Sequence, residues 1–289
     1  MFYSPLRYPG GKGKLEPFME LLIRQTGHEG GIYVEPFAGG AGIAIGLLEK
    51  GIVSDIVIND LDKGIYSFWR AILSETDRFV KDIQTAELTI SEWYRQKSIA
   101  ENNKVYSYEL GFATFYLNRT NRSGIIKGGI IGGLEQSGQW KMDARFNKDA
   151  LINRIKKISS KKKHIHLYNK DVNSFIIDYL PKYQNNAFVY FDPPYFNKGK
   201  QLYLNFFSYE DHVRIEKIIN EKVLCDWVIT YDDVPEICDI YKNHILKKFD
   251  LNYSAGEKRR ASEIIIFKSE KIVPSNEQLK QNNIILNLR

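Results

Sequence analysis

Seven short runs of apolar and β-branched residues recur along this chain, and helix-like stretches separate most of them. Each run ends in acidic or turn-forming residues. The runs cover residues 31–35, 55–59, 164–168, 187–191, 225–230, 244–251 and 263–268. Strands that alternate with helices predict a mostly parallel sheet with helices on both faces. No helical pattern lies between the last two runs, so we expect them to pair as an antiparallel hairpin at one edge of the sheet.

The interval between the second and third runs is far longer than an ordinary connection, which indicates an insertion. The other helix-like stretches cover residues 43–50, 63–73, 171–179 and 210–221. Within the insertion, residues 75–86 and 91–117 have a helical pattern, and residues 118–139, rich in Gly, Asn and Ser, indicate a loop. We therefore predict one α/β domain from residues 1–74 and 164–289 and an inserted, largely helical domain at 75–163.

The positive charge of the chain is concentrated in this insertion. The 289 residues include 41 Lys and Arg against 35 Asp and Glu, a formal net charge of +6. Residues 75–163 carry +7, so the remainder is nearly neutral. Such a block is typical either of an ordinary solvated face or of a surface that binds a polyanion. Charge alone leaves both interpretations open.

Composition excludes several classes of protein. A hydrophobic fraction of 43% supports a packed core and excludes a disordered chain. No apolar stretch approaches the roughly 20 residues that cross a bilayer, and the N-terminal residues lack a signal-peptide pattern. The two cysteines, Cys225 and Cys238, have no zinc or redox spacing. We therefore expect a cytoplasmic protein without a membrane segment and without a metal.

A glycine-rich turn follows the first predicted strand. Residues 35–42 read Glu-Pro-Phe-Ala-Gly-Gly-Ala-Gly, and a helical stretch begins at once. Glycines in such a turn permit positive φ and a close approach of ligand to backbone. The second strand leads into Asp60, whose carboxylate can accept hydrogen bonds from two ribose hydroxyls. Together these features indicate a site for an adenosine-containing cofactor; a tight turn with a capping Asp is the alternative.

Two common nucleotide motifs do not fit the chain. The turn is a poor match to the G-x-G-x-x-G pattern of dinucleotide-binding proteins. Residues 9–15 read Pro-Gly-Gly-Lys-Gly-Lys-Leu and lack the G-x-x-x-x-G-K-[ST] spacing and its hydroxyl. Hydride-transfer enzymes and nucleotide triphosphatases are therefore disfavoured.

The fourth predicted strand ends in the segment Asp192-Pro193-Pro194-Tyr195. Two consecutive prolines remove two N–H donors and stiffen the loop, so the Asp192 carboxylate and the Pro193 carbonyl project as acceptors. Two acceptors beside an aromatic ring suit an amino group on a flat base, which Tyr195 can stack against. A rigid strand-ending turn is the structural alternative.

Four blocks in order give a specific resemblance. They are residues 6–12 (Leu-Arg-Tyr-Pro-Gly-Gly-Lys), 34–42 (Val-Glu-Pro-Phe-Ala-Gly-Gly-Ala-Gly), 58–60 (Ile-Asn-Asp) and 191–195 (Phe-Asp-Pro-Pro-Tyr). The chain resembles the Dam-type DNA adenine-N(6) methyltransferases, in the group whose cofactor motif precedes the DPPY motif. The resemblance implies S-adenosylmethionine as methyl donor and a seven-stranded, Rossmann-like class I methyltransferase sheet. It also implies that the insertion is a target-recognition domain.

The resemblance assigns residues to two sites. The catalytic residues would be Asp192, Pro193, Pro194 and Tyr195. The cofactor contacts would be Tyr8, Gly11, Lys12, Glu35, Pro36, Phe37, Gly39, Gly40, Gly42, Asp60, Asp171 and Asp192. Tyr8 replaces the Trp of some family members, which should preserve stacking. Asp171 is explained equally well as a helix N-cap.

The expected reaction is methyl transfer to the exocyclic amino group of adenine. If Asp192 and the Pro193 carbonyl each accept one N–H, the nitrogen lone pair is freed to face the methyl group. A carboxylate with an ordinary pKa of about 4 is too weak to deprotonate a neutral aryl amine. The proton should therefore leave after transfer.

The expected partner is double-stranded DNA, with or without a cognate restriction endonuclease. A stacked adenine cannot reach the Asp192 loop, so the target must be flipped out. In the insertion, we predict two groups of DNA contacts. One is Arg119, Asn121 and Arg122, which offer guanidinium and amide groups to base edges, and the other is Lys161, Lys162 and Lys163, which suit phosphates. Two alternatives remain at this point: methylation of RNA adenine or of the cytosine 4-amino group, and a non-catalytic DNA-binding protein on the same fold. The presence of both Asp192 and Lys12 disfavours the last.

Overall fold

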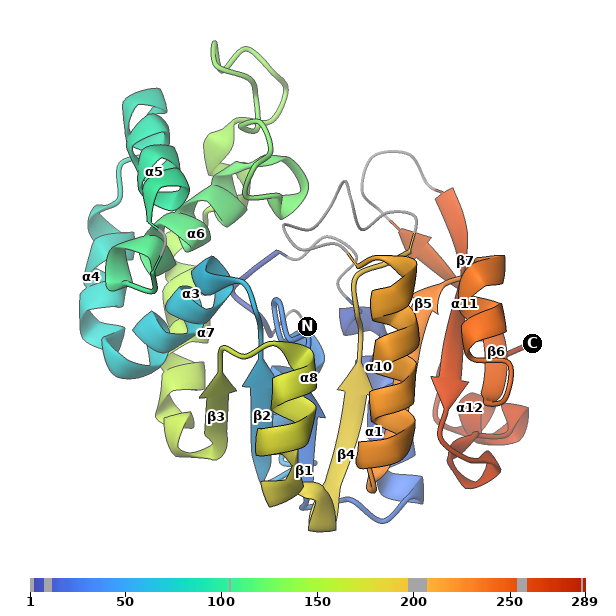
Figure 1. Ribbon diagram of the computed structural model, residues 1–289. Coiled ribbons are helices and arrows are strands. Elements are labelled where there is room, and N and C mark those ends of the chain that lie inside the picture. Colours follow the sequence, from blue (N-terminus) through green and yellow to red (C-terminus); the bar gives the residue numbers. More distant parts are fainter. Residues whose placement is uncertain (1–2, 8–11, 104, 197–206, 254–258, 287) are drawn as a thin grey trace.

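The computed structural model describes residues 3–7, 12–103, 105–196, 207–253, 259–286 and 288–289 (Figure 1). The described chain forms a seven-stranded sheet with the strand order β3-β2-β1-β4-β5-β7-β6. The strands are β1 (Ile32–Glu35), β2 (Asp55–Asn59), β3 (Ile165–Tyr168), β4 (Ala187–Phe191), β5 (Asp226–Asp232), β6 (Ile245–Tyr253) and β7 (Arg259–Phe267). Strands β1 to β5 pair in parallel, whereas β7 is antiparallel to both β5 and β6. The predicted α/β class, the mostly parallel sheet and the antiparallel edge hairpin are confirmed.

The strand order reverses at β1, which lies between β2 and β4. Ligands of open α/β sheets bind beyond the carboxyl ends of the strands at such a reversal, because the flanking loops diverge there. The glycine turn follows β1, and the Asp192 segment follows β4. The topology therefore brings the two principal sequence motifs to the same edge of the sheet.

Helices cover both faces of the sheet (Figure 1). They are α1 (Glu16–Gln25), α2 (Gly42–Glu49), α3 (Lys63–Ser74), α4 (Thr76–Thr85), α5 (Ile90–Asn102), α6 (Tyr108–Thr120), α7 (Lys148–Ser160), α8 (Val172–Ser174) with a π-helical turn (Phe175–Tyr179), α10 (Tyr209–Lys222), α11 (Pro235–Ile240) and α12 (Asn276–Gln281). Helices α1, α7, α11 and α12 were not anticipated from the sequence.

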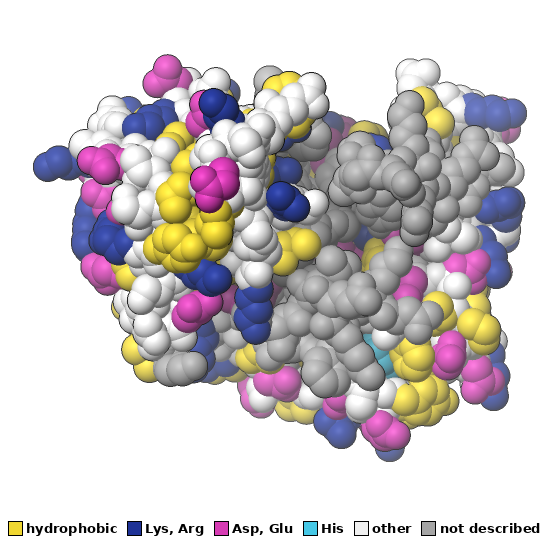
Figure 2. All heavy atoms as spheres, turned by 90° about the horizontal axis from the view of Figure 1, so that it is seen from above, with side chains coloured by type: hydrophobic (Ala, Val, Ile, Leu, Met, Phe, Trp, Pro, Cys, Tyr) yellow, Lys and Arg dark blue, Asp and Glu magenta, His cyan; other side chains and the backbone are white. Residues whose placement is uncertain are grey.

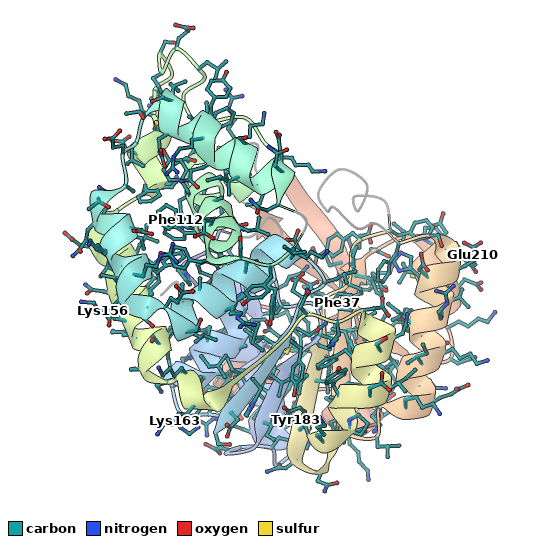
Figure 3. The ribbon with its side chains drawn as sticks, turned by 60° about the vertical axis from the view of Figure 1, so that its left-hand side comes forward. Phe37, Phe112, Lys156, Lys163, Tyr183 and Glu210 are labelled. Atoms are coloured by element: carbon teal, nitrogen blue, oxygen red, sulfur yellow. The ribbon has the colours of Figure 1, made fainter. Side chains whose placement is uncertain are left out.

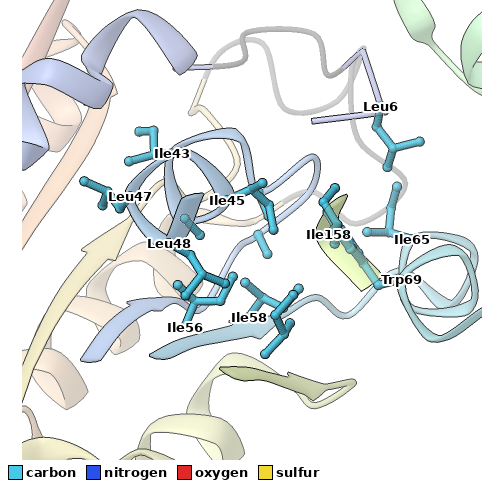
Figure 4. Close-up of a cluster of buried hydrophobic side chains, with 14 of the residues drawn as sticks. Leu6, Ile43, Ile45, Leu47, Leu48, Ile56, Ile58, Ile65, Trp69 and Ile158 are labelled. Carbon is cyan, nitrogen blue, oxygen red and sulfur yellow. The ribbon is translucent and has the colours of Figure 1, made fainter. Parts of the chain in front are cut away.

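Alternate strand residues point to two separate apolar clusters. On β2, Ile56 and Ile58 pack with α2 and α3 on one face, and Val57 faces the cluster on the other side. Figure 4 shows the first cluster, in which Leu6 from the N-terminal segment packs near Ile65 and Ile158 from α7 lies close to Trp69. Burial on both faces is the physical reason that the strands read as continuous apolar runs.

The insertion packs on the sheet domain through α3 and α6. At Gly111 of α6, a Cβ atom would lie only 2.5 Å from the carbonyl oxygen of Ser67, so glycine is required for this close helix contact. The rings of Phe68 and Phe115 stack at 5.9 Å, and Phe79 meets Phe115 edge-on at 5.3 Å. The insertion therefore shares a core with the sheet domain.

Two predicted boundaries in the insertion are wrong. The stretch 91–117, predicted as helical throughout, is two helices, because α5 ends at Asn102 and Ser107 caps a new helix by accepting the Leu110 N–H at 3.0 Å. Helix α6 then runs to Thr120, so the first residues of the predicted 118–139 loop are helical. No described helix combines the length and apolarity needed to cross a bilayer.

Candidate active site

The glycine turn after β1 is held by two neighbouring elements. Asp60 after β2 accepts the Gly39 N–H at 2.8 Å, and the Trp69 indole N–H of α3 donates to the Gly39 carbonyl at 2.9 Å. Gly39 has φ +46°, but Ala41 also has φ +45°. A left-handed alanine is strained, so its fixed neighbours must stabilise the turn. Trp69 was not predicted as a site residue, and only its position in an amphipathic helix signalled burial.

Glu35, at the end of β1, is buried against the first turn of α2. Its carboxylate accepts the Ala44 N–H at 3.1 Å. Burial raises the pKa of Glu35 to about 8, and the charge of Asp192 contributes in the same direction. Glu35 thus links β1 to α2 beneath the glycine turn.

Asn59 and Asp60 connect the ends of three strands. The buried Asn59 amide donates to the carbonyls of Pro36 and Lys170 at 3.0 and 3.1 Å. Asp60 accepts the N–H groups of Gly39 and Asp62, each at 2.8 Å. Burial, followed by the charge of Asp62, raises the pKa of Asp60 to about 7. The predicted ribose-binding acid therefore lies directly against the glycine turn.

Asp171 is the N-cap of α8. Its carboxylate accepts the N–H groups of Asn173 at 3.0 Å and Ser174 at 3.4 Å. The structural alternative considered for this residue is thus observed, and its contact with a cofactor remains a proposal.

Asp192 follows β4 and is oriented by the next strand. The Thr230 hydroxyl of β5 donates to Asp192 Oδ1 at 2.9 Å. Burial raises the pKa of Asp192 to about 6; the positive charge of Lys12 opposes this shift, and Glu263 reinforces it. Asp192 is therefore more basic than the ordinary carboxylate assumed from the sequence.

Tyr195 is joined to the N-terminal segment and to β7. Lys12 Nζ contacts both the Tyr195 hydroxyl and Glu263, and the Tyr195 hydroxyl donates to Glu263 Oε1 at 2.9 Å. Lys12 and Glu263 are 5% and 1% exposed, so the ion pair is buried. Sequence reasoning missed Glu263; its only signal was an acidic residue at the head of the apolar run 264–267.

The remaining predicted cofactor residues are partly outside the described chain. Tyr8 and Gly11 lie outside the described residues. Pro36, Phe37, Gly40 and Gly42 belong to the glycine turn and the start of α2, and the Phe37 ring meets Phe207 edge-on at 6.0 Å. In the described ranges, no group of three or more His, Cys, Asp or Glu residues is arranged to hold a metal ion.

The predicted DNA contacts comprise two buried residues, one exposed arginine and a run of three lysines. Asn121 is fully buried: its amide donates to the carbonyls of Ile125 and Ile126, and its oxygen accepts from the Trp93 indole at 2.7 Å. This structural role does not fit the predicted contact with base edges. Arg119 is also buried, whereas Arg122 is exposed.

The lysine run 161–163 lies before β3, at the amino end of a parallel strand. Figure 3 shows Lys163 at the same end of the molecule as Tyr183, which precedes β4, and far from Phe37 in the glycine turn. Lys161 also donates to the Leu48 carbonyl at 2.8 Å. The predicted phosphate contacts of Lys161, Lys162 and Lys163 therefore do not fit DNA bound over the Asp192 loop.

The strand order, the glycine turn after β1, the acid after β2 and the DPPY segment after β4 together define a class I methyltransferase. The chain belongs to the family of D12 class N6 adenine-specific DNA methyltransferases, whose family model matches residues 8–255. This confirms the predicted enzyme class, an adenine-specific DNA methyltransferase.

Individual relatives are more distant. The Type II methyltransferase M.MjaIII of Methanocaldococcus jannaschii is 25% identical over 231 residues, which cover 73% of this chain and 77% of that protein. Among solved structures, the rRNA methyltransferase aviRa of Streptomyces viridochromogenes has 10% identity and a TM-score of 0.39, covering 88% of this chain and 83% of that one. Protein LPL1258 of Legionella pneumophila has 11% identity and a TM-score of 0.36, covering 96% and 90%. These structural likenesses are too remote to indicate a substrate.

Proposed function

We propose that this enzyme uses S-adenosylmethionine to methylate the N6 amino group of an adenine flipped out of duplex DNA. The observation that carries the proposal is the position of Asp192. Its carboxylate is oriented by Thr230, and its loop lies beside the glycine turn at the reversal of strand order. An acceptor fixed at this edge of the sheet is what methyl transfer to an amine requires.

The chemistry of the glycine-turn region fits this cofactor. Burial raises the pKa of Glu35, Asp60 and Asp192 above the ordinary carboxylate range. A ligand that carries positive charge would be favoured beside these groups, because it would offset the cost of burying their charged forms. Asp60 would accept the ribose hydroxyls. When bound, S-adenosylmethionine would supply a methyl group attached to a positively charged sulfur.

The residues of the chain hold and orient the acceptor amine. Asp192 and the Pro193 carbonyl would each accept one N–H, which favours a tetrahedral nitrogen with its lone pair free. Such positioning is worth about 7–11 kcal/mol in favourable intramolecular reactions. A carboxylate with a pKa of about 6 cannot deprotonate a neutral aryl amine, but it can accept a proton from the cationic product. Asp192 would therefore receive the proton after transfer.

The insertion at 75–163 is proposed as the target-recognition domain. It carries the excess positive charge of the chain and packs beside the site through α3. Extraction of the adenine from the duplex costs a few kcal/mol, and contacts with the DNA backbone would offset this cost.

The proposal is tested by transfer of a tritiated methyl group to duplex DNA, single-stranded RNA and a duplex with cytosine as the only amino-bearing base. We expect label in adenine-containing DNA only. Asp192→Ala should reduce transfer by at least about a hundredfold, since it removes both acceptor and orientation, while DNA binding survives. Label in RNA but not in DNA would refute the acceptor, and full activity of Asp192→Ala would refute the assigned role.

A further inference from the structure

Four arginines come together where the N-terminal segment meets the insertion. They are Arg7, Arg119 at the end of α6, Arg145 in the turn Met142–Arg145, and Arg154 on α7, and the charges of Arg7, Arg145 and Arg154 all act on Arg119. The N-terminal segment is fixed at this place, because the Arg7 N–H donates to Asn118 Oδ1 and the Asn118 amide donates back to the Arg7 carbonyl, each at 2.7 Å. Three separate parts of the sequence thus place positive charge at one junction.

The charges that act on Arg119 at this junction are all positive. Burial is the largest cause that lowers the pKa of Arg119, the positive charges of Arg7, Arg154 and Arg145 act in the same direction, and together they bring it to about 9. Arg119 is only 9% exposed, and its Nε has no hydrogen-bond partner in the described chain. The hydrogen bonds of Arg7 and Arg154 go to the neutral carbonyls of Asn121 and Ser4, at 3.3 and 3.5 Å. Buried like charges are costly unless an anion joins them.

The cluster is open to a ligand on one side. Arg145 is exposed and Arg154 and Arg7 are half-buried, so an anion in solvent can reach these three members of the cluster. Figure 2, which views the molecule from above the carboxyl ends of β1 to β4, shows Lys and Arg side chains mixed with Asp and Glu side chains over the left-hand part of this face. A planar guanidinium group can donate two parallel hydrogen bonds to two oxygens of one phosphate, whereas a lysine ammonium group acts as a point charge. A cluster of arginines therefore suits a phosphate better than a cluster of lysines does.

We propose that this arginine cluster binds one phosphodiester group of the DNA backbone. The inference rests on the proposed function, because that function supplies DNA as the ligand. Arg7 shortly precedes Lys12, whose ammonium group contacts Tyr195 in the active site. A phosphate held by the cluster would therefore add a link between Arg7 and the insertion when DNA binds.

The test compares Arg154→Gln with Lys156→Gln, an identical change of charge on an exposed residue of α7. In Figure 3, Lys156 points outward from the insertion. We expect Arg154→Gln to weaken binding to a duplex oligonucleotide roughly fivefold to tenfold and to reduce the salt slope by about 0.9, the value for one phosphate. Its Tm without DNA should equal or exceed that of the wild type, because repulsion is relieved. Arg145→Gln, an exposed change, should show the same reduced slope.

Two results would overturn the proposal. One is affinity and salt slope equal to those of Lys156→Gln in both arginine variants. The other result combines two measurements. If millimolar inorganic phosphate raised the Tm of the wild type but not of Arg154→Gln, and if Arg154→Gln bound DNA with wild-type affinity, the cluster would bind free phosphate and not DNA. Methyl transfer by the wild type, measured in parallel, distinguishes failure of the proposed function from failure of this inference. If the wild type methylates adenine and the arginine variants bind DNA normally, only the role of the cluster is refuted.

Discussion

In its proposed role as an acceptor for the target amine, Asp192 must be ionised, and its neighbours set the pH range in which it is. Burial is the largest influence and raises its pKa, Lys12 lowers it, and Glu263 raises it, with a result of about 6. The group is therefore mostly charged at neutral pH, yet it is a better proton acceptor than an exposed aspartate. Both properties suit a residue that first holds an amine and then receives its proton.

The raised pKa of Asp192 predicts an acid limb in the rate of the free enzyme. As the pH falls through about 6, Asp192 is protonated and can no longer accept the N–H of the amine. We expect kcat/KM for duplex DNA to fall roughly tenfold per pH unit below this point. Initial rates between pH 5 and 8 at constant ionic strength, with circular dichroism to verify folding, measure the effect. A limb near the ordinary aspartate pKa would contradict it.

At the scale of elements, strand ends were predictable from sequence because they combine apolar runs with turn residues. Strands β2 and β4 have the predicted bounds, and the Asp60 and Asp192 segments follow them as expected. Glu263 was not predictable in the same way. Its partner Lys12 is 251 positions away in sequence, and only the position of β7 beside β5 brings the two together. Pairing of distant segments leaves no local pattern to read.

Glu263 had only a weak sequence signal, whereas Asn121 had one that was misleading. An Asn between arginines in a polar, glycine-containing segment has the composition of a nucleic-acid contact, but its amide fastens the turn after α6 to Trp93. Burial of a single polar side chain depends on the packing of α5 against α6, which composition does not contain.

The link from β7 to the N-terminal segment predicts a specific effect of Glu263→Gln. The change removes a negative charge that raises the pKa of Asp192 and releases Lys12 from its ion pair. Both effects stabilise ionised Asp192, so the acid limb should move below pH 6. The loss of the buried ion pair should also lower Tm, because Lys12 is left without this partner. An unchanged acid limb with a lower Tm would show that Glu263 has a structural role only.

The whole molecule has an uneven charge distribution, but the charge is not all on one face. The insertion contains the excess, and α7 within it runs down to the amino end of β3. The arginine cluster lies where the insertion meets the N-terminal segment. The lysine run lies at the amino end of β3, away from the glycine turn. Counting charge by sequence segment could not separate these two groups.

This separation predicts that the lysine run does not contribute to binding of duplex DNA. Lys162 and Lys163 are exposed and lie at the amino end of β3, so the length of the strand, roughly 13 Å at 3.3 Å per residue, separates them from the active-site edge. That distance exceeds the Debye length of about 10 Å at 0.1 M salt. The double variant Lys162→Gln/Lys163→Gln should therefore change the Kd less than about twofold at this ionic strength and leave the salt slope unchanged. Arg122→Gln, at an exposed position after α6, should reduce the slope by about 0.9 in the same titration. A slope reduced by nearly twice that amount in the lysine variant would place DNA on the opposite edge of the molecule.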